Sequence, residues 1–78
     1  MTREYRYMII LHPDPEDGGY TVTVRSLPGI ATEGETFEEA ISMAKEAIAL
    51  HIEGLMAHGL AVPEEATNAQ ALIVGVAA

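Results

Sequence analysis

The sequence predicts an α+β fold with the element order β-β-β-α-β, in which one mixed four-stranded sheet is covered on one face by a long helix. Three observations predict it: alternating apolar and polar residues at 20–25, a capped amphipathic stretch from Thr36, and an apolar run near the C-terminus. Periods of two and of about 3.6 residues are typical of half-buried strands and amphipathic helices. We expect a single domain over residues 1–78, because a chain of this length is too short for two separate cores.

The first expected strand covers residues 4–12 (EYRYMIILH). It is rich in β-formers and nearly all apolar in its second half, which favours a central strand that is covered on both faces, or at least well flanked. Pro13 then ends the strand, and residues 17–19 (DGG) supply the positive φ angles that a reversal of the chain needs. A hairpin with a loose loop is therefore expected here.

The second and third expected strands follow this loop. In residues 20–25 every second residue is apolar, so one face of the strand is buried and the other meets water. Residues 27–29 (LPG) form a turn, because proline presets its own φ angle and glycine follows it. Residues 30–33 then give a short strand at the edge of the sheet.

A capped helix is expected next. Thr36 at the N-cap and Glu39 three residues later form a capping box, and the acidic first turn suits the positive end of the helix dipole. The helix extends from Phe37 to about His58, and Gly59 ends it at the C′ position.

The apolar residues of this helix form two stripes. We expect the heavier stripe to face the sheet, and it consists of Phe37, Ile41, Ala44, Ile48, Ile52 and Leu55. The whole apolar arc is wider than one packing face requires, so the lighter stripe has a second contact, either another subunit or the loop at residues 27–31. Three residues of the lighter stripe are the predicted oligomer interface: Met43, Ala47 and Leu50.

Residues 71–76 (ALIVGV) are the fourth expected strand. A strand that is reached through a helical crossover is most simply parallel to one already in the sheet, with a right-handed connection. The long first strand offers the free edge, which gives the spatial order 3-2-1-4.

Composition narrows the possible functions. Twelve acidic and four basic residues give a formal charge of -8, whereas a protein that neutralises phosphates needs the opposite sign, so we expect no direct nucleic-acid binding. The same charge attracts a basic partner. The chain has no cysteine, which excludes disulfides and thiolate sites. It shows no secretory leader and no apolar run of membrane length, so we expect a cytoplasmic protein without membrane contact.

We expect no catalytic, cofactor-binding or metal-binding residues. His51 and His58 are seven residues apart on one helix, whereas helical metal ligands use spacings of three or four. We expect His51 to lie at a protein interface. The middle of the first strand lacks the acidic residue that a metal-dependent nuclease needs. The acidic side chains instead predict a partner-facing rim: Glu16, Asp17, Glu33, Glu35, Glu38 and Glu39.

Several short motifs between Tyr5 and Pro63 together resemble the HicB-like antitoxin family. Each motif is weak alone, but their order and spacing make the set specific. In this sequence they stand as Tyr5, Gly18-Gly19-Tyr20, Leu27-Pro28-Gly29, Thr32-Glu33-Gly34-Glu35-Thr36, Glu38-Glu39-Ala40, Gly59 and Pro63.

The resemblance implies a reduced RNase H-like fold and a non-enzymatic protein that blocks a HicA-type toxin, a small basic mRNA-cleaving protein that uses a histidine. Many members also carry a C-terminal DNA-binding domain, which we do not expect here because the chain ends soon after the fourth strand. Ile30 stands where the family usually has cysteine, and residues 25–26 stand where proline is common; both departures affect packing. The alternative hypothesis is a solitary homo-oligomer, a dimer or tetramer, with a structural or unknown regulatory role and no surviving toxin.

Overall fold

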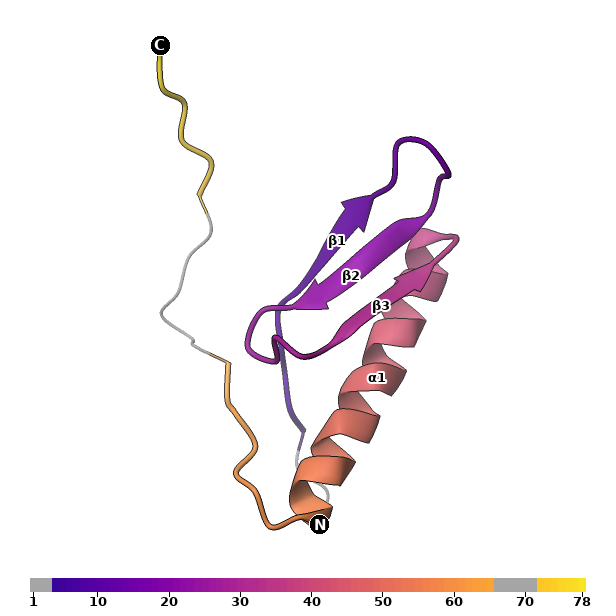
Figure 1. The fold of residues 1–78 in the computed structure, drawn as a ribbon, viewed down its shortest axis with the longest axis vertical. Helices are drawn as coiled ribbons and strands as arrows, with labels where there is room; N and C mark the ends of the chain where they lie inside the picture. The colour runs from indigo at the N-terminus through magenta and orange to yellow at the C-terminus, as the bar shows by residue number, and fades with distance from the viewer. Residues whose placement is uncertain (1–3, 66–71) are drawn as a thin grey trace.

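The computed structural model describes residues 4–65 and 72–78, and in these residues three β-strands are followed by one α-helix (Figure 1). The strands form an antiparallel sheet in the order β1-β2-β3, and α1 lies against β3 and β2. The α+β part of the prediction is therefore confirmed. The elements are β1 (Ile9–Pro13), β2 (Tyr20–Val24), β3 (Ala31–Gly34) and α1 (Phe37–Ala57).

Strand β2 is the central strand, and its alternating apolar side chains are buried in the core, as predicted. Thr21 is exposed, whereas Val22 and Val24 are almost completely buried. Val22 faces α1, and Val24 faces the turn that follows β2. Two clusters of buried side chains result: Val22, Ala40 and Ala44 in the first, and Val24, Leu27 and Ile30 in the second.

Strand β1 is an edge strand, so the prediction of a central strand covered on both faces is wrong. Ile9 and Leu11 are half-buried and pack against the core, whereas Met8 and Ile10 point to the other side and are 41% and 42% exposed. The apolar run of the sequence indicates that burial of both faces of β1 is favourable. It does not specify what buries them.

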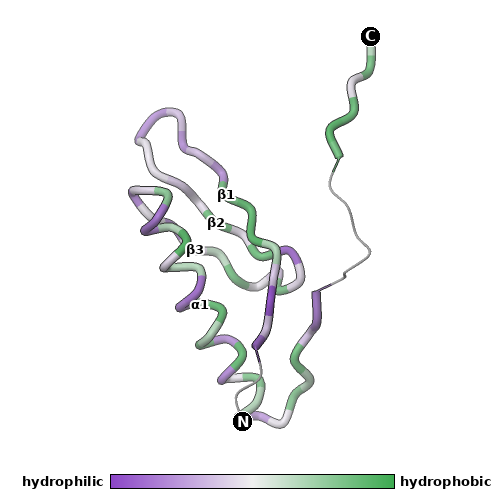
Figure 2. The backbone as a smooth tube through the Cα atoms, turned by 180° about the vertical axis from the view of Figure 1, so that it is seen from behind, coloured by the Kyte–Doolittle hydropathy of each residue, from purple (hydrophilic) through white to green (hydrophobic). Residues whose placement is uncertain are grey.

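The predicted fourth strand is also wrong for this structure. Residues 72–78 form no strand and run apart from the sheet, on the side of β1, in both Figure 1 and Figure 2. Ala71, the first residue of the predicted strand, lies outside the described residues. A strand forms only where a neighbouring backbone takes its hydrogen bonds, and within the described part of the chain the outer edge of β1 pairs with no strand.

The mixed sheet and the order 3-2-1-4 therefore lack support, and the likeness to RNase H stays a prediction. The side chains of the expected strand are at least 75% exposed: Leu72, Ile73, Val74 and Val76.

Both ends of α1 follow the prediction closely. The Thr36 hydroxyl accepts a hydrogen bond from the backbone N–H of Glu39 at 3.0 Å. The Glu39 carboxylate reaches back to the N–H of Glu35 at 3.4 Å, one residue before the position that a standard capping box uses. At the other end Gly59 has a φ of 67° and donates to the Met56 carbonyl, as a glycine C′ residue does.

The face that α1 turns to the sheet agrees with the predicted one in part. Ala44 of the heavier stripe is buried as predicted, together with Ala40 of the lighter stripe, whereas Phe37 of the heavier stripe is 50% exposed. Small side chains allow a close approach: a Cβ atom on Gly34 of β3 would lie 2.4 Å from the Ala40 nitrogen. The sheet is too narrow to cover the isoleucines of the heavier stripe as well, so they remain half-buried at its margin.

Candidate acidic interface

Acidic side chains gather where the β1–β2 loop, the end of β3 and the first turns of α1 meet. A depression of about 480 Å³ lies between these elements. The antiparallel register pairs Tyr20 with Gly34 and Thr21 with Glu33, which brings the acidic loop before β2 beside the acidic end of β3. Five carboxylates line the depression: Asp14, Asp17, Glu33, Glu35 and Glu39.

The structure brings together four of the six residues of the predicted rim. Glu16 and Glu38 are exposed and lie outside the lining of the depression, although each is a sequence neighbour of a residue that lines it. Asp14 lines the depression and was not among the predicted residues. Its signal was present in the sequence, because an aspartate at the start of a glycine-rich loop commonly caps a turn with its own side chain.

Asp14 organises the loop. Its Oδ1 atom accepts hydrogen bonds from the backbone N–H groups of Glu16 at 2.9 Å and Asp17 at 3.2 Å, and its carbonyl accepts one from Gly18 at 3.1 Å. The bond from Glu16, followed by the bond from Asp17, favours the charged carboxylate and lowers the pKa of Asp14 from its ordinary value. Gly18 and Gly19 have φ angles of 74° and 77°, as the predicted reversal requires.

We expect the carboxyl group of Asp14 to titrate below the range of a free aspartate in an NMR chemical-shift titration. Because the pKa is lower in the folded state, the carboxylate contributes stability above the unfolded pKa, and this contribution is lost as the pH falls through the folded pKa. Asp14→Asn keeps an oxygen acceptor but cannot ionise, so it should remove this part of the pH dependence. A pKa at or above the ordinary value would contradict the loop geometry.

The predicted oligomer residues lie in three different environments. Met43 is 40% exposed and lines the acidic depression, and Leu50 is 62% exposed. Ala47 packs against the cluster that contains Leu27 and Ile30, so the loop contact considered from the sequence accounts for this residue. A contact with another subunit through this stripe stays a prediction. His51 is exposed on the same helix.

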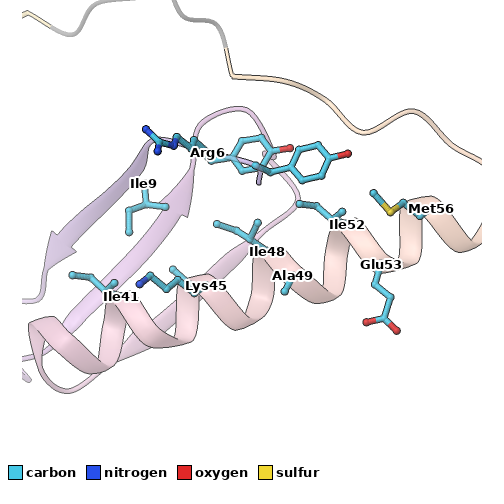
Figure 3. Close-up of a pocket in the computed structure, with 12 residues that line it drawn as sticks. Arg6, Ile9, Ile41, Lys45, Ile48, Ala49, Ile52, Glu53 and Met56 are labelled. Atoms are coloured by element: carbon cyan, nitrogen blue, oxygen red, sulfur yellow. The ribbon is translucent and has the colours of Figure 1, made fainter. Parts of the chain in front are cut away.

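A larger groove, of about 860 Å³, lies between residues 5–9 and the second half of α1. Figure 3 shows Ile41, Ile48 and Ile52 projecting from α1 toward Ile9 and Arg6 on the opposite wall. The lining is mainly apolar, and its charged residues are Arg6, Lys45 and Glu53. Such a lining suits an apolar occupant better than a strongly charged one.

The histidines make local contacts. His12 Nε2 lies 3.1 Å from the Thr23 hydroxyl, and His58 Nδ1 lies 2.8 Å from the Gly54 carbonyl. Within residues 4–65 and 72–78, no group of three or more His, Asp or Glu side chains is placed to hold a metal ion. In the same residues no helix combines the length and the apolar character that crossing a membrane takes.

The fold is that of a small α+β module with an acidic depression and an apolar groove on its surface. The chain belongs to the HicB-like antitoxin family. The sequence profile of that family, described as "HicB_like antitoxin of bacterial toxin-antitoxin system", matches residues 7–74. The resemblance found in the sequence motifs is thereby confirmed, and membership supports an antitoxin role in a toxin-antitoxin system.

Comparison with individual proteins agrees with this assignment. A UPF0150 protein of Thermoplasma acidophilum is 42% identical over 69 residues, which cover 88% of this chain and 96% of that protein. A UPF0150 protein of Synechocystis is 44% identical over 61 residues, 78% of this chain and 76% of that protein. The antitoxin HicB of Escherichia coli is 46% identical over 43 residues, which are 55% of this chain but 30% of that protein. No solved structure matches the chain significantly.

Proposed function

We propose that this chain is an antitoxin that binds a small, basic, mRNA-cleaving toxin of the HicA type and neutralises it by covering its RNA-binding surface. The observation that supports the proposal is the gathering of five carboxylates around one depression in a chain of charge -8. A protein that cleaves RNA binds phosphates and so presents a positive surface. Carboxylates occupy the same surface in place of phosphates. In this proposal the chain is not an enzyme and acts in the cytoplasm, where mRNA is cleaved.

The depression has a composition that suits a protein partner. Its lining combines the carboxylates with Met43 and Tyr20. Interfaces commonly combine an apolar centre with a polar rim, and methionine adapts to irregular partners. Tyr20 is held in place by Phe37, whose ring stands edge-on to it with 5.9 Å between the centroids.

The backbone that carries three of these carboxylates is held before a partner arrives. The pairing of β3 with β2 fixes the backbone of Glu33, the hydrogen bond to Asp14 fixes that of Asp17, and the first turn of α1 fixes that of Glu39. A surface whose groups are already placed loses less conformational entropy on binding than one that must order itself. The proposal therefore predicts a fast, electrostatically steered association.

The test is to neutralise part of the rim. We expect Glu33→Gln combined with Glu35→Gln to raise the Kd for a HicA-type toxin by roughly tenfold, because two attractive charges are removed. Calorimetry measures the binding, and cleavage of a reporter mRNA measures the neutralisation. The Kd of the unchanged chain should rise as salt is added, because salt screens the attraction.

The matched control is Glu46→Gln combined with Glu53→Gln. It changes the net charge equally, and both residues are exposed on α1 outside the depression. It should leave the Kd within about twofold of the original value. Equal loss of binding in both double variants would show that net charge alone acts, and a Kd that does not respond to salt would contradict the electrostatic mechanism.

A further inference from the structure

The outer edge of β3 is an open surface for strand pairing. β3 is the last strand of the sheet, and in the part of the chain that the structure describes no further strand lies beyond it. Its residues Ala31 and Glu33 are exposed. An edge of this kind can accept a strand of another protein, whose backbone then takes up the free hydrogen-bonding groups.

The hydrogen bonds of the sheet determine which backbone groups point outward. Successive residues of an antiparallel strand bond alternately to one side and to the other. The Arg25 N–H donates to the Met8 carbonyl at 3.3 Å, so Arg25 bonds toward β1 and Val22, an odd number of residues away, bonds toward β3. Val22 is paired with Thr32. Thr32 therefore turns its N–H and C=O groups toward β2, and the residues on either side of it turn theirs outward.

The outward positions along this edge are Ala31, Glu33 and Glu35. The Glu35 N–H donates to the Glu39 carboxylate at 3.4 Å, so a side chain takes the place of a neighbouring strand there. The N–H groups of Ala31 and Glu33 have no acceptor within the described residues. Backbone donors in proteins are nearly always paired with protein or water, so these two are available to a partner.

A hollow beside the edge has room for the side chains of such a strand. It has a volume of about 430 Å³ and is lined by Thr21, Ala31, Thr32, Glu33 and Met43. Met43 belongs to α1, which packs against β3 (Figure 1), and is 40% exposed. Side chains of a strand point alternately to opposite faces. One set of side chains of an added strand would therefore contact Met43, and the other set would lie beside Thr21 and Glu33.

The charge around the edge favours a basic strand. The hollow shares Thr21, Glu33 and Met43 with the acidic depression, so the two surfaces are continuous. A strand that runs past Gly34 meets the carboxylates of the depression, which attract lysine and arginine side chains. A second copy of this chain is disfavoured at this edge, because it brings its own Glu33 and a charge of -8 to the same place.

We propose that the toxin binds by adding a strand to the outer edge of β3, with basic residues at the end of that strand that passes Gly34. This mode of binding rests on the proposed function, because the toxin is the partner. The backbone groups of Ala31 and Glu33 bind the added strand, Met43 packs against one of its side chains, and the carboxylates bind its basic end. Backbone hydrogen bonds then supply affinity, and the charges discriminate between partners.

Amide hydrogen exchange, followed by NMR on the isotopically labelled chain, tests the added strand. In the complex with a HicA-type toxin, the N–H groups of Ala31 and Glu33 should exchange at least about tenfold more slowly, because each gains an acceptor. Leu11 is the control. It is paired with Val22, so its N–H points outward from β1, and its rate should stay within about twofold. Unchanged exchange at Ala31 and Glu33, or equal slowing at Leu11, would overturn the proposal.

Ala31→Pro gives a second test, because it removes an outward N–H and leaves the hydrogen bonds between β3 and β2 in place. Proline is tolerated on the solvent side of an edge strand. By calorimetry, the Kd for the toxin should rise about tenfold or more, whereas Ala31→Ser, which keeps the N–H, should stay within about twofold. Circular dichroism checks that both variants fold. If Ala31→Pro does not fold, the exchange rates of the unchanged chain decide.

The outcomes separate this proposal from the antitoxin proposal. If the unchanged chain binds no HicA-type toxin, both are wrong. If it binds with a Kd that depends on salt, while folded Ala31→Pro binds equally well, strand addition is wrong and the antitoxin proposal stands. Slow exchange of Ala31 and Glu33 in the chain alone would mean that this edge is already covered, by a second copy or by the chain itself, and would also overturn strand addition.

Discussion

Gly34→Ala should lower the free energy of unfolding by about 3 kcal/mol or more, because one methyl group collides with backbone that has no room to move. A Cβ atom at this position would lie 2.4 Å from the Ala40 nitrogen, 2.7 Å from the Ala40 Cα and 2.8 Å from the Glu39 carbonyl carbon. Relief requires the start of α1 to move away from β3, which opens the cluster of Val22, Ala40 and Ala44. For a chain of this size the expected fall in Tm is roughly 12–24 °C.

Gly29→Ala is the matched control, since a Cβ atom at Gly29 has no neighbour within 4 Å and Gly29 is not among the residues with positive φ. We expect its effect to stay within about 0.5 kcal/mol, with a slight stabilisation because alanine restricts the unfolded chain more than glycine does. Thermal unfolding followed by circular dichroism compares the two variants. Similar Tm values for Gly34→Ala and the natural chain would mean that α1 packs less closely on β3 than the structure has it.

The elements that the sequence predicted correctly are those with local signals. The alternation in β2 repeats every two residues, and the N-cap at Thr36 and the C′ glycine at Gly59 act within one helical turn. Such signals depend on neighbours in the chain, so they need no knowledge of the tertiary structure. For this reason β2 and both ends of α1 were predicted to within a residue or two.

The elements that were mispredicted depend on partners far away in the chain. One apolar run lies in β1 and another follows Ala71, and both indicate side chains whose burial is favourable. The pattern does not say whether a neighbouring strand, the helix or another molecule buries them. The helix face was predicted only in part for the same reason. Ala44 of the predicted stripe is buried, but the close approach of Gly34 to Ala40 brings this residue of the lighter stripe into the core as well.

The sequence predicted a group of acidic residues but not their arrangement in space. The sequence does not show that Glu16 and Glu38 lie outside the depression while the adjacent Asp17 and Glu39 line it. The position of each side chain relative to the depression depends on the loop conformation and on the turn of the helix. The depression itself follows from the register of β2 and β3. Asp14 stands in the same acidic group of the sequence as Glu16 and Asp17, but its role in holding the loop depends on the loop conformation.

Leu27→Ala should be the second strongly destabilising change, at about 2–5 kcal/mol, the range for a buried leucine whose cavity is not refilled. Leu27 is 2% exposed and packs with Val24 and Ile30, and its backbone accepts a hydrogen bond from the Ile30 N–H at 3.0 Å. The Leu-Pro-Gly motif by which the family is recognised thus has a structural reason here, since its leucine is a core residue.

The control is Leu50→Ala, which removes the same atoms from a side chain that is 62% exposed. It should change the free energy of unfolding by no more than about 0.5 kcal/mol, because exposed substitutions lose little packing and alanine is a good helix former. Urea unfolding of both variants measures the difference. If Leu27→Ala and Leu50→Ala lower the free energy of unfolding equally, the turn after β2 is not part of the core. The second cluster of buried residues, Val24, Leu27 and Ile30, would then be wrong.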